Sequence, residues 1–467
     1  MIGGAALGAT AFGLSGCAKS SGQTIRVAVG TQDSTINCAA GGLMIRELKL
    51  LEKYLPRTGK YEHVDYDIQW QNFTSGAPLT NEMVAGKLDI GAMADFPGTF
   101  NGAAFQKAGR RSIFLNVLCG SVHGSGNGIV VPTKSSARSL ADLKGKAISV
   151  PFASTAHGML LRAIRDLGWD PNKDVQISMQ PPEVAGSALR AGTIDAHADF
   201  VPFAELFPFR GFATKIFDGS QAKTPTFHGS LVDADYAQKY PEIVIAYQRA
   251  AIEANQLLAQ DPEKYSQLVA DRTGVDAEVV YLFHGPLGLQ TRDLTWKPEY
   301  RQAIQIAAQT LTLLKRQRID ITPENFIDDR YILRAFEAAK LDYAQELKNY
   351  GRTPLNANDA ASKAPITSME RVAQIWVTGE PKVRAYATPE GALEDLAVIE
   401  KGGKQVRVVY AQDRNSGIKL LAADAWFSVG PHKTVDAFLL RDQAQTWASG
   451  HNGRVTDFAG TRAAVSA

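Results

Sequence analysis

Polar side chains that could hold a small solute gather in three short segments, and each segment follows an apolar, strand-like run. The segments are residues 31–38, 95–98 and 151–157. In folds that alternate strands and helices, such segments lie where a strand ends and a helix begins, and the free N–H groups of a helix start attract anions. The side chains that we expect to contact a ligand are Gln32, Asn37, Cys38, Asp95, Phe96, Ser154, Thr155, His157 and Asp199.

Several of these residues also have a purely structural interpretation. Ser154 and Thr155 could simply cap the helix that follows them, and capping alone is enough to explain both. For His157, contact with a ligand and packing at the helix start both stay open. For Cys38 we favour a role as a small buried apolar residue, and Cys119, inside an apolar run, is assigned to the core.

Asp195, His197 and Asp199 alternate along the chain, and an extended segment would place these three potential metal ligands on one face. We favour a loop after the turn that contains Asp195, because a site for a hard metal usually gathers more ligands. We therefore expect no metal there. His228 and His284 are each followed by glycine and indicate structural turns.

Composition and motifs argue against several classes of protein. Lys and Arg number 50 against 48 Asp and Glu, so the net charge of +2 gives no electrostatic footprint for nucleic acid. Three cysteines are too few for a disulfide framework. The sequence lacks the G-x-x-x-x-G-K-[S/T], H-E-x-x-H, C-x-x-C and G-x-S-x-G motifs. We expect neither catalysis nor a cofactor.

The elements that must position these segments alternate between strands and helices. Short apolar runs such as 25–29, 88–92 and 147–150 alternate with helical patterns, which implies parallel sheets covered on both faces. Longer helices are predicted at 241–259, 262–271, 298–315 and 329–338.

The chain of 467 residues is long enough for two or three compact units. Residues 351–365 are rich in Asn, Asp, Ala, Ser and Pro without periodicity, which predicts a linker. Residues 366–467 then combine paired strands with helices and predict a small α+β domain.

The first residues suggest export. Residues 2–16 are uncharged, small and apolar, and the sequence Leu-Ser-Gly-Cys that ends at Cys17 resembles a bacterial lipobox. Residues 1–23 are therefore predicted to be a lipoprotein signal and tether, although no Lys or Arg precedes the apolar run. We expect an extracytoplasmic protein anchored by a lipid on Cys17. No later stretch is apolar and long enough to span a membrane.

One longer motif resembles a known family. Residues 73–79, Phe-Thr-Ser-Gly-Ala-Pro-Leu, precede a short helical pattern and then Gly86-Lys87-Leu88-Asp89-Ile90-Gly91, and residues 94–97 follow as Ala-Asp-Phe-Pro. A second-lobe counterpart is Gly192-Thr193-Ile194-Asp195-Ala196. Over residues 24–350 the chain is similar to the substrate-binding proteins of ABC importers for nitrate, sulfonate and taurine.

This resemblance implies the two-lobe, type II periplasmic-binding-protein fold, with lobe one at 24–125 and 230–350 and lobe two at 126–229. It implies capture of a small anionic or zwitterionic solute between the lobes, and delivery to ABC permease subunits by a monomer. Related pyrimidine-precursor synthases share the fold, but the chain lacks their cysteine-rich motif.

The C-terminal residues 366–460 resemble the NosL family of copper-binding lipoproteins, on segments such as 371–375, 425–431 and 448–458. The family's Cys-x-x-Cys-Gly-Met start is absent, and the loss of soft ligands argues against tight copper binding. Met369 and His432 could be remnants of a site. A copper-handling accessory lipoprotein is accordingly the alternative function.

Two properties follow from these expectations. A fragment of residues 24–350 should fold alone, because few contacts should cross the linker. His157 should be mostly neutral without a bound solute, and the affinity for an anion should rise as the pH falls through the imidazole range.

Overall fold

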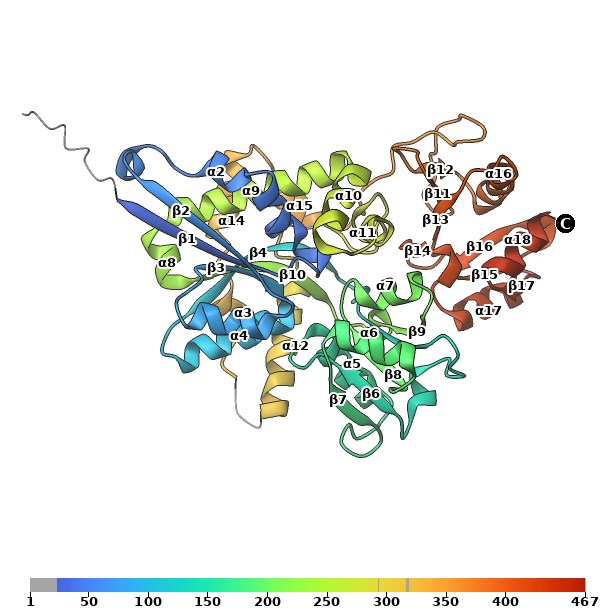
Figure 1. Ribbon diagram of the computed structural model, residues 1–467, viewed down its shortest axis with the longest axis horizontal. Helices are drawn as coiled ribbons and strands as arrows, with labels where there is room; N and C mark the ends of the chain where they lie inside the picture. The colour runs from blue at the N-terminus through green and yellow to red at the C-terminus, as the bar shows by residue number, and fades with distance from the viewer. Residues whose placement is uncertain (1–22, 293, 316–318, 467) are drawn as a thin grey trace, which may run out of the picture.

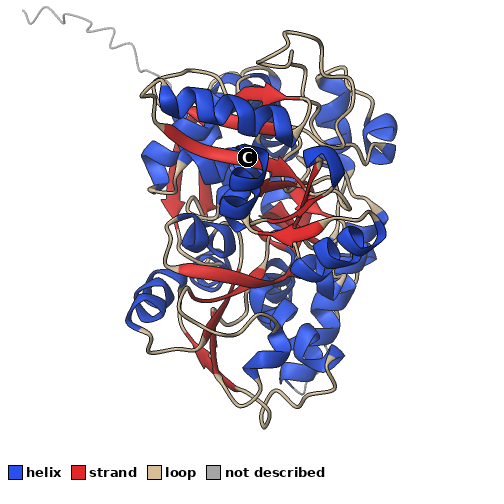
Figure 2. Ribbon diagram, turned by 90° about the vertical axis from the view of Figure 1, so that its right-hand side faces the viewer, coloured by secondary structure: helices blue, strands red, loops and turns tan. Residues whose placement is uncertain are grey.

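The computed structural model describes residues 23–292, 294–315 and 319–466. Two lobes, each built on a five-stranded sheet, lie side by side, and a smaller unit that holds the C-terminus packs at one end (Figure 1). Helices cover the outer faces of the sheets (Figure 2). The predicted signal and the lipidated Cys17 lie outside the described residues. Within the described ranges, no helix combines the length and the apolarity that crossing a membrane requires.

Lobe one contains a sheet with the strand order β2-β1-β3-β10-β4. Strand β1 is parallel to β2 and β3, whereas β10 is antiparallel to β3 and β4. Every residue of β4 is buried, as expected for a strand covered on both faces. The strands are β1 (Thr24–Thr31), β2 (Asp65–Asn72), β3 (Ile90–Ala94), β4 (Ser112–Ser121) and β10 (Thr226–Asp233).

The helices of lobe one come from both ends of its chain segment. They are η1 (Ile36–Gly41), α1 (Leu43–Glu47), α2 (Leu50–Tyr54), η2 (Gly59–Tyr61), α3 (Gly76–Val84), α4 (Asp95–Lys107), α8 (Ala234–Lys239), α9 (Pro241–Gln260), α10 (Pro262–Thr273), α11 (Ala277–His284), α12 (Pro298–Lys315), α13 (Pro323–Phe326), α14 (Arg330–Ala338) and α15 (Tyr343–Lys348). The four long helices predicted from periodicity correspond to α9, α10, α12 and α14.

Lobe two contains a sheet with the order β7-β6-β8-β5-β9, which is the arrangement of lobe one repeated. Its strands are β5 (Gly128–Pro132), β6 (Ala147–Val150), β7 (Gln176–Met179), β8 (Ala196–Asp199) and β9 (Ala213–Asp218). Its helices are η3 (Leu140–Leu143), α5 (Thr155–Asp166), α6 (Pro182–Ala191), α7 (Phe203–Phe209) and η4 (Gly219–Ala222).

The chain crosses between the lobes twice, from β4 to β5 and from β9 to β10. The first crossing agrees with the expected position. The expected end of lobe two at residue 229 is wrong, because Thr226 pairs with Ser121 and His228 with Cys119 in the sheet of lobe one. Residues 226–229 therefore belong to lobe one.

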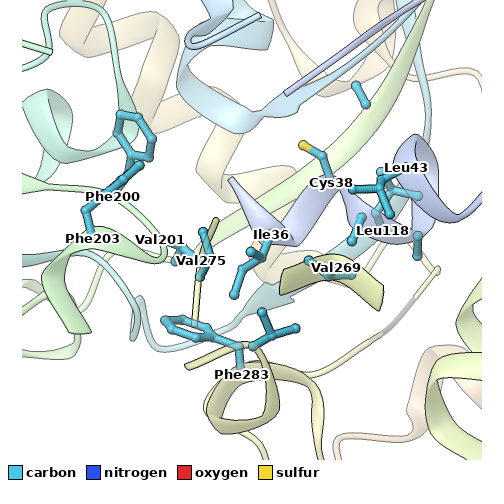
Figure 3. Packing of buried hydrophobic residues seen from close by; sticks show 14 of the residues in the cluster. Ile36, Cys38, Leu43, Leu118, Phe200, Val201, Phe203, Val269, Val275 and Phe283 are labelled. Atoms are coloured by element: carbon cyan, nitrogen blue, oxygen red, sulfur yellow. The ribbon is translucent and has the colours of Figure 1, made fainter. Parts of the chain in front are cut away.

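An apolar contact joins the lobes next to α11. Ile36 of η1 and Phe283 of α11 belong to the same buried cluster as Val201 and Phe203 of lobe two (Figure 3). The two lobes therefore share one continuous core at this edge.

The C-terminal unit contains two small antiparallel sheets and three longer helices. The first sheet comprises β11 (Ala373–Val377), β12 (Arg384–Tyr386), β13 (Val406–Gln412) and β14 (Lys419–Leu421), and the second comprises β15 (Trp426–Val429), β16 (Val435–Phe438) and β17 (Arg454–Thr456). The helices are α16 (Pro389–Lys401), α17 (Arg441–Gly450) and α18 (Phe458–Ser466), with the short turns η5 (Ala422–Asp424) and η6 (Pro431–Lys433). This confirms the predicted α+β class.

Residues 351–365 are packed rather than extended between two separate units. The Leu287 N–H donates to Thr353 O at 2.8 Å, Arg352 donates to Gly288 O at 2.7 Å, and Leu355 is buried beside Leu287. The segment lacks periodicity because its polar groups bond individually, Arg352 and Thr353 to lobe one and the Asp359 carboxylate to the Ala387 N–H of the C-terminal unit.

The C-terminal unit is also fixed directly to lobe one. The Tyr410 hydroxyl donates to Glu278 O at 2.8 Å, and Arg407 forms an ion pair with the Glu278 carboxylate at 2.6 Å. The rings of Trp376 and Tyr281 lie 5.4 Å apart. The expectation that few contacts cross residues 351–365 is therefore wrong.

Candidate functional site

Three helix starts converge on a cavity at the boundary between the lobes. Helices α3 and α4 come from lobe one and α5 from lobe two. The residues that line the cavity are Gln32, Thr35, Ser75, Gly76, Ala77, Ala94, Pro97, Phe152, Ala153, Ser154, Thr155, Phe200 and His228. Free N–H groups at helix starts favour an anionic group. No lysine or arginine occurs among these residues.

Local sequence explains how the helix starts come together. Ser154 caps α5: its hydroxyl oxygen accepts from the His157 N–H at 3.2 Å and its hydroxyl donates to Pro151 O at 2.5 Å. Gly76 opens α3, and a Cβ atom added there would lie 2.4 Å from Pro97 Cβ. Glycine therefore allows the starts of α3 and α4 to approach each other.

Asp95, the first residue of α4, is buried at the lobe boundary. Its Oδ1 accepts from the Phe96 N–H at 2.8 Å, from the Thr226 hydroxyl at 3.5 Å and from the Thr155 hydroxyl of lobe two at 3.4 Å. Burial raises the pKa of Asp95 to about 7, although these three donors act to lower it. Burial thus favours the protonated form of this carboxyl group far more than solvent does.

A second cavity adjoins the first, and both are narrow. Asp95, Phe96 and Thr155 line it together with the inner face of α12. The two cavity volumes are about 30 and 20 Å³, which is room for little more than water. The lobes are thus close together, and a larger solute requires them to move or their side chains to turn.

The structure brings five of the predicted site residues to these cavities: Gln32, Asp95, Phe96, Ser154 and Thr155. The other four lie behind the cavity walls. The assignment of all nine residues to a ligand site remains a prediction.

Asn37 and Cys38 belong to η1 and are buried beneath the cavity. The Asn37 carbonyl accepts from Cys119 Sγ at 3.4 Å, and Cys38 Sγ lies 3.2 Å from His228 Nδ1. Burial raises the pKa of the Cys38 thiol to about 12, so this cysteine stays a neutral thiol. This supports the buried, structural interpretation of Cys38.

Asp199 ends strand β8 rather than lying in a loop, so the loop expected after Asp195 is not formed. Its Oδ2 lies 2.8 Å from His197 Nε2, while His197 Nδ1 lies 2.8 Å from Ser149 Oγ. Both ring nitrogens of His197 are thus engaged within lobe two.

His157 supports the cavity wall from behind. Its ring stacks on Phe152 with the centroids 4.8 Å apart, and its Nδ1 accepts from the Ala153 N–H at 3.3 Å. Burial lowers the pKa of His157 to about 4. The lowered pKa agrees with the predicted neutrality of His157 without a bound solute, although burial rather than the helix start is its cause. The rise of anion affinity with falling pH stays a prediction.

The buried imidazole should make the fold sensitive to acid. The folded-state pKa of His157 lies below the ordinary value near 6.5, so the unfolded chain takes up its proton first as the pH falls. His157→Gln should reduce the loss of unfolding free energy between pH 7.5 and pH 5 by about 2 kcal/mol, measured by urea unfolding. The same exchange at exposed His63 should leave that loss unchanged, and equal effects of the two exchanges would contradict the assignment.

Sequence reasoning missed several cavity residues. Phe152 and Phe200 carry no polar group that singles them out, and the start of α3 was noted only as part of a motif. The turn predicted at His228 is wrong, because His228 lies inside strand β10 and lines the cavity. Its position next to glycine is explained by close packing, since a Cβ added at Gly229 would lie 2.4 Å from Asn116 O.

A larger hollow lies elsewhere, on the outer face of lobe one. Its volume is about 680 Å³, and α8, α13 and α14 border it. Two of its carboxylates are already paired, Asp328 with Arg330 at 2.5 Å and Asp329 with Arg301 at 3.3 Å. We therefore place the candidate site at the lobe boundary.

Comparison with known proteins points to the same place. Residues 44–271 match the NMT1-like family. The matched range includes α3, α4 and α5, whose starts surround the lobe-boundary cavity. It begins inside lobe one, runs through the whole of lobe two and returns to lobe one.

Three known proteins illustrate what this chain is similar to. The taurine-binding periplasmic protein of Escherichia coli is 27% identical over 295 residues, which is 62% of this chain and 80% of the relative. The structure of the periplasmic aliphatic sulphonate binding protein SsuA from Escherichia coli is 25% identical, with a TM-score of 0.51, and covers 65% of this chain and 97% of its own. The structure of the alkanesulfonate-binding protein SsuA from Xanthomonas axonopodis pv. citri, bound to MOPS, is 24% identical, with a TM-score of 0.53. The match covers 65% of this chain and 98% of the SsuA chain.

These likenesses confirm the predicted two-lobe binding-protein fold of the chain, followed by a small C-terminal sheet domain. The resemblance of that domain to the NosL family remains a prediction. Met369 packs against the cluster around Leu355, whereas His432 is exposed in η6. Among the described residues, no group of three or more His, Cys, Asp and Glu side chains could hold a metal ion.

Proposed function

We propose that the chain is the extracytoplasmic solute-binding component of an ABC importer. It captures a small anionic or zwitterionic solute of the sulfonate, taurine or nitrate class between its two lobes and delivers that solute to permease subunits. It acts by binding rather than by catalysis.

The observation that carries this proposal is the convergence of three helix starts on one cavity between the lobes. Ser75, Gly76, Ser154 and Thr155 line the cavity without a lysine or arginine among the lining residues, and backbone N–H groups in the first turn of a helix have no partner within the helix. Such a set suits a weakly basic oxyanion, which needs several hydrogen bonds. The relatives named for binding taurine and sulfonates support the same class of solute.

The cap of α5 provides a test. Ser154→Ala should weaken the binding of taurine or ethanesulfonate by three- to tenfold, because the hydroxyl fixes the N–H groups that face the solute. Isothermal calorimetry would measure this, with nitrate and sulfate as further probes. The variant should also lose about 1 kcal/mol of stability, as N-cap variants do.

Thr388→Ala is the matched control. Thr388 caps α16 of the C-terminal unit by accepting from the Gly391 N–H at 3.2 Å. It should lose similar stability and bind the solute normally. Equal affinity changes in the two variants would contradict the proposed site. So would a wild type whose melting temperature does not shift with taurine, ethanesulfonate, nitrate or sulfate.

A further inference from the structure

A buried carboxyl group links the two lobes directly. Asp95 lies at the start of α4 in lobe one, only 4% of its surface is exposed, and it accepts from the Thr155 hydroxyl of lobe two at 3.4 Å. The neighbouring Phe96 packs on α5, where a Cβ added at Gly158 would lie 3.0 Å from the Phe96 ring. The burial of Asp95 therefore depends on the contact between lobes.

Few titratable groups surround this carboxyl group. On the elements packed around it, α5 contributes His157 and β10 contributes His228, and burial lowers the pKa of the first to about 4 and of the second to about 3. Helix α12 faces the cavity with Ala303, Ala307 and Thr310, and the loops of the two crossings with Gly124, Asn127, Gly219 and Thr224. The surroundings of Asp95 thus offer hydrogen bonds but no cation to compensate a carboxylate.

We propose that closing of the two lobes takes up a proton at Asp95, so that acid favours the closed arrangement. When the lobes part, water reaches the carboxyl group and stabilises its charge. When they close, the charge loses that water and gains only the hydroxyls of Thr155 and Thr226 and the Phe96 N–H. All three bonds end on Oδ1, which leaves Oδ2 to carry the proton.

The shift of the pKa supports this coupling. In the closed arrangement burial raises the pKa of Asp95 to about 7 from the ordinary 3.8. A group that binds its proton more tightly in one state draws the equilibrium toward that state as the pH falls. The equilibrium constant for closing of the two lobes should therefore rise about tenfold for each pH unit below 7, down to about pH 4.

Closing that depends on pH would regulate the proposed site. It rests on the proposed function only where closing changes the affinity for a solute. Closing itself is measured without solute, by the distance between spin labels on Lys107→Cys and Arg165→Cys. Both positions are exposed, on α4 and α5. Cys17 is replaced by serine, and the buried Cys38 and Cys119 stay unlabelled because burial raises the pKa of both thiols.

We expect the short-distance population to grow as the pH falls from 8 to 5, and to be large and independent of pH in Asp95→Asn. The control Asp199→Asn removes another buried carboxyl group, one held inside lobe two, and should keep the wild-type dependence. Thr155→Val removes a hydroxyl that stabilises the Asp95 carboxylate in the closed arrangement, so closing should weaken more at pH 8 than at pH 5 and the dependence on pH should become larger.

A wild-type distance that does not change with pH, or the same change in Asp95→Asn, would overturn the proposal. If Asp95→Asn does not fold, Thr155→Val decides instead, and a difference in closing between pH 8 and pH 5 that is equal to or smaller than that of the wild type overturns the proposal. Failure of every sulfonate to bind would contradict the proposed function and leave these distances unaffected.

Discussion

A chain that ends at Tyr350 should unfold at a clearly lower urea concentration than the full chain, or aggregate. Removal of the C-terminal unit would expose Tyr281 and Leu282, each 1% exposed in the full chain. It would also remove Trp376, Tyr410 and Leu421, which belong to the same core cluster as the two lobes. Loss of burial costs about 1.5–3 kcal/mol for each large apolar side chain, so the sum is a large part of the stability of a domain.

A point variant separates this packing from other effects of truncation. Trp376→Ala should destabilise the full chain by about 3–5 kcal/mol, the usual cost of deleting a buried aromatic ring. Trp426→Ala is the matched control, because Trp426 is only half-buried and contacts Arg441 of its own unit. Circular dichroism during urea unfolding measures both, and an unchanged midpoint for the truncated chain would refute the shared core.

Removal of Lys215 should have a comparably large effect. Its ammonium group lies in lobe two, 2.6 Å from Asp218 Oδ2 and in contact with the Glu205 carboxylate, and all three side chains are buried. Lys215→Met would leave two carboxylates close together without a cation. Breaking such a buried pair costs about 3–5 kcal/mol.

The exposed pair between Lys404 and Glu380 serves as the comparison. Lys404→Met breaks a contact of 2.9 Å, but solvent screens both partners. It should cost less than about 1 kcal/mol. Chemical denaturation of the two variants at pH 7 compares them, and similar losses would show that the cluster around Lys215 contributes no more than a surface pair.

The alternating strand and helix patterns were sufficient to predict helix-covered sheets and the C-terminal α+β class, whereas the division into two lobes came from the resemblance to a family. They are local signals, since a buried strand such as β4 must be apolar along its whole length. Contacts between units leave no comparable signal. Tyr281 and Tyr410 look like ordinary core residues in the sequence, and only the structure shows that they pack on each other, with ring centroids 5.5 Å apart.

The role of a residue in the candidate site could be predicted where its residue type has a single local role, as a serine before a helix has. Ser154 precedes a helical pattern and does cap α5. Burial was not predictable in the same way. The sequence places His157 at a helix start, but only its stacking on Phe152 shows why its pKa falls, and only the contact between lobes shows why that of Asp95 rises.

The two lobes repeat one strand order, so their sheets are near-equivalents of each other. The C-terminal unit ends that equivalence, because it is held by α10 and α11 and lies against the α7 edge of lobe two (Figure 1). Any partner that must touch both lobes finds that edge occupied. Such a partner is left with the parts of the two lobes that the C-terminal unit does not cover, among them the contact of α4 with α5, so the extra unit distinguishes one edge of the molecule from the others.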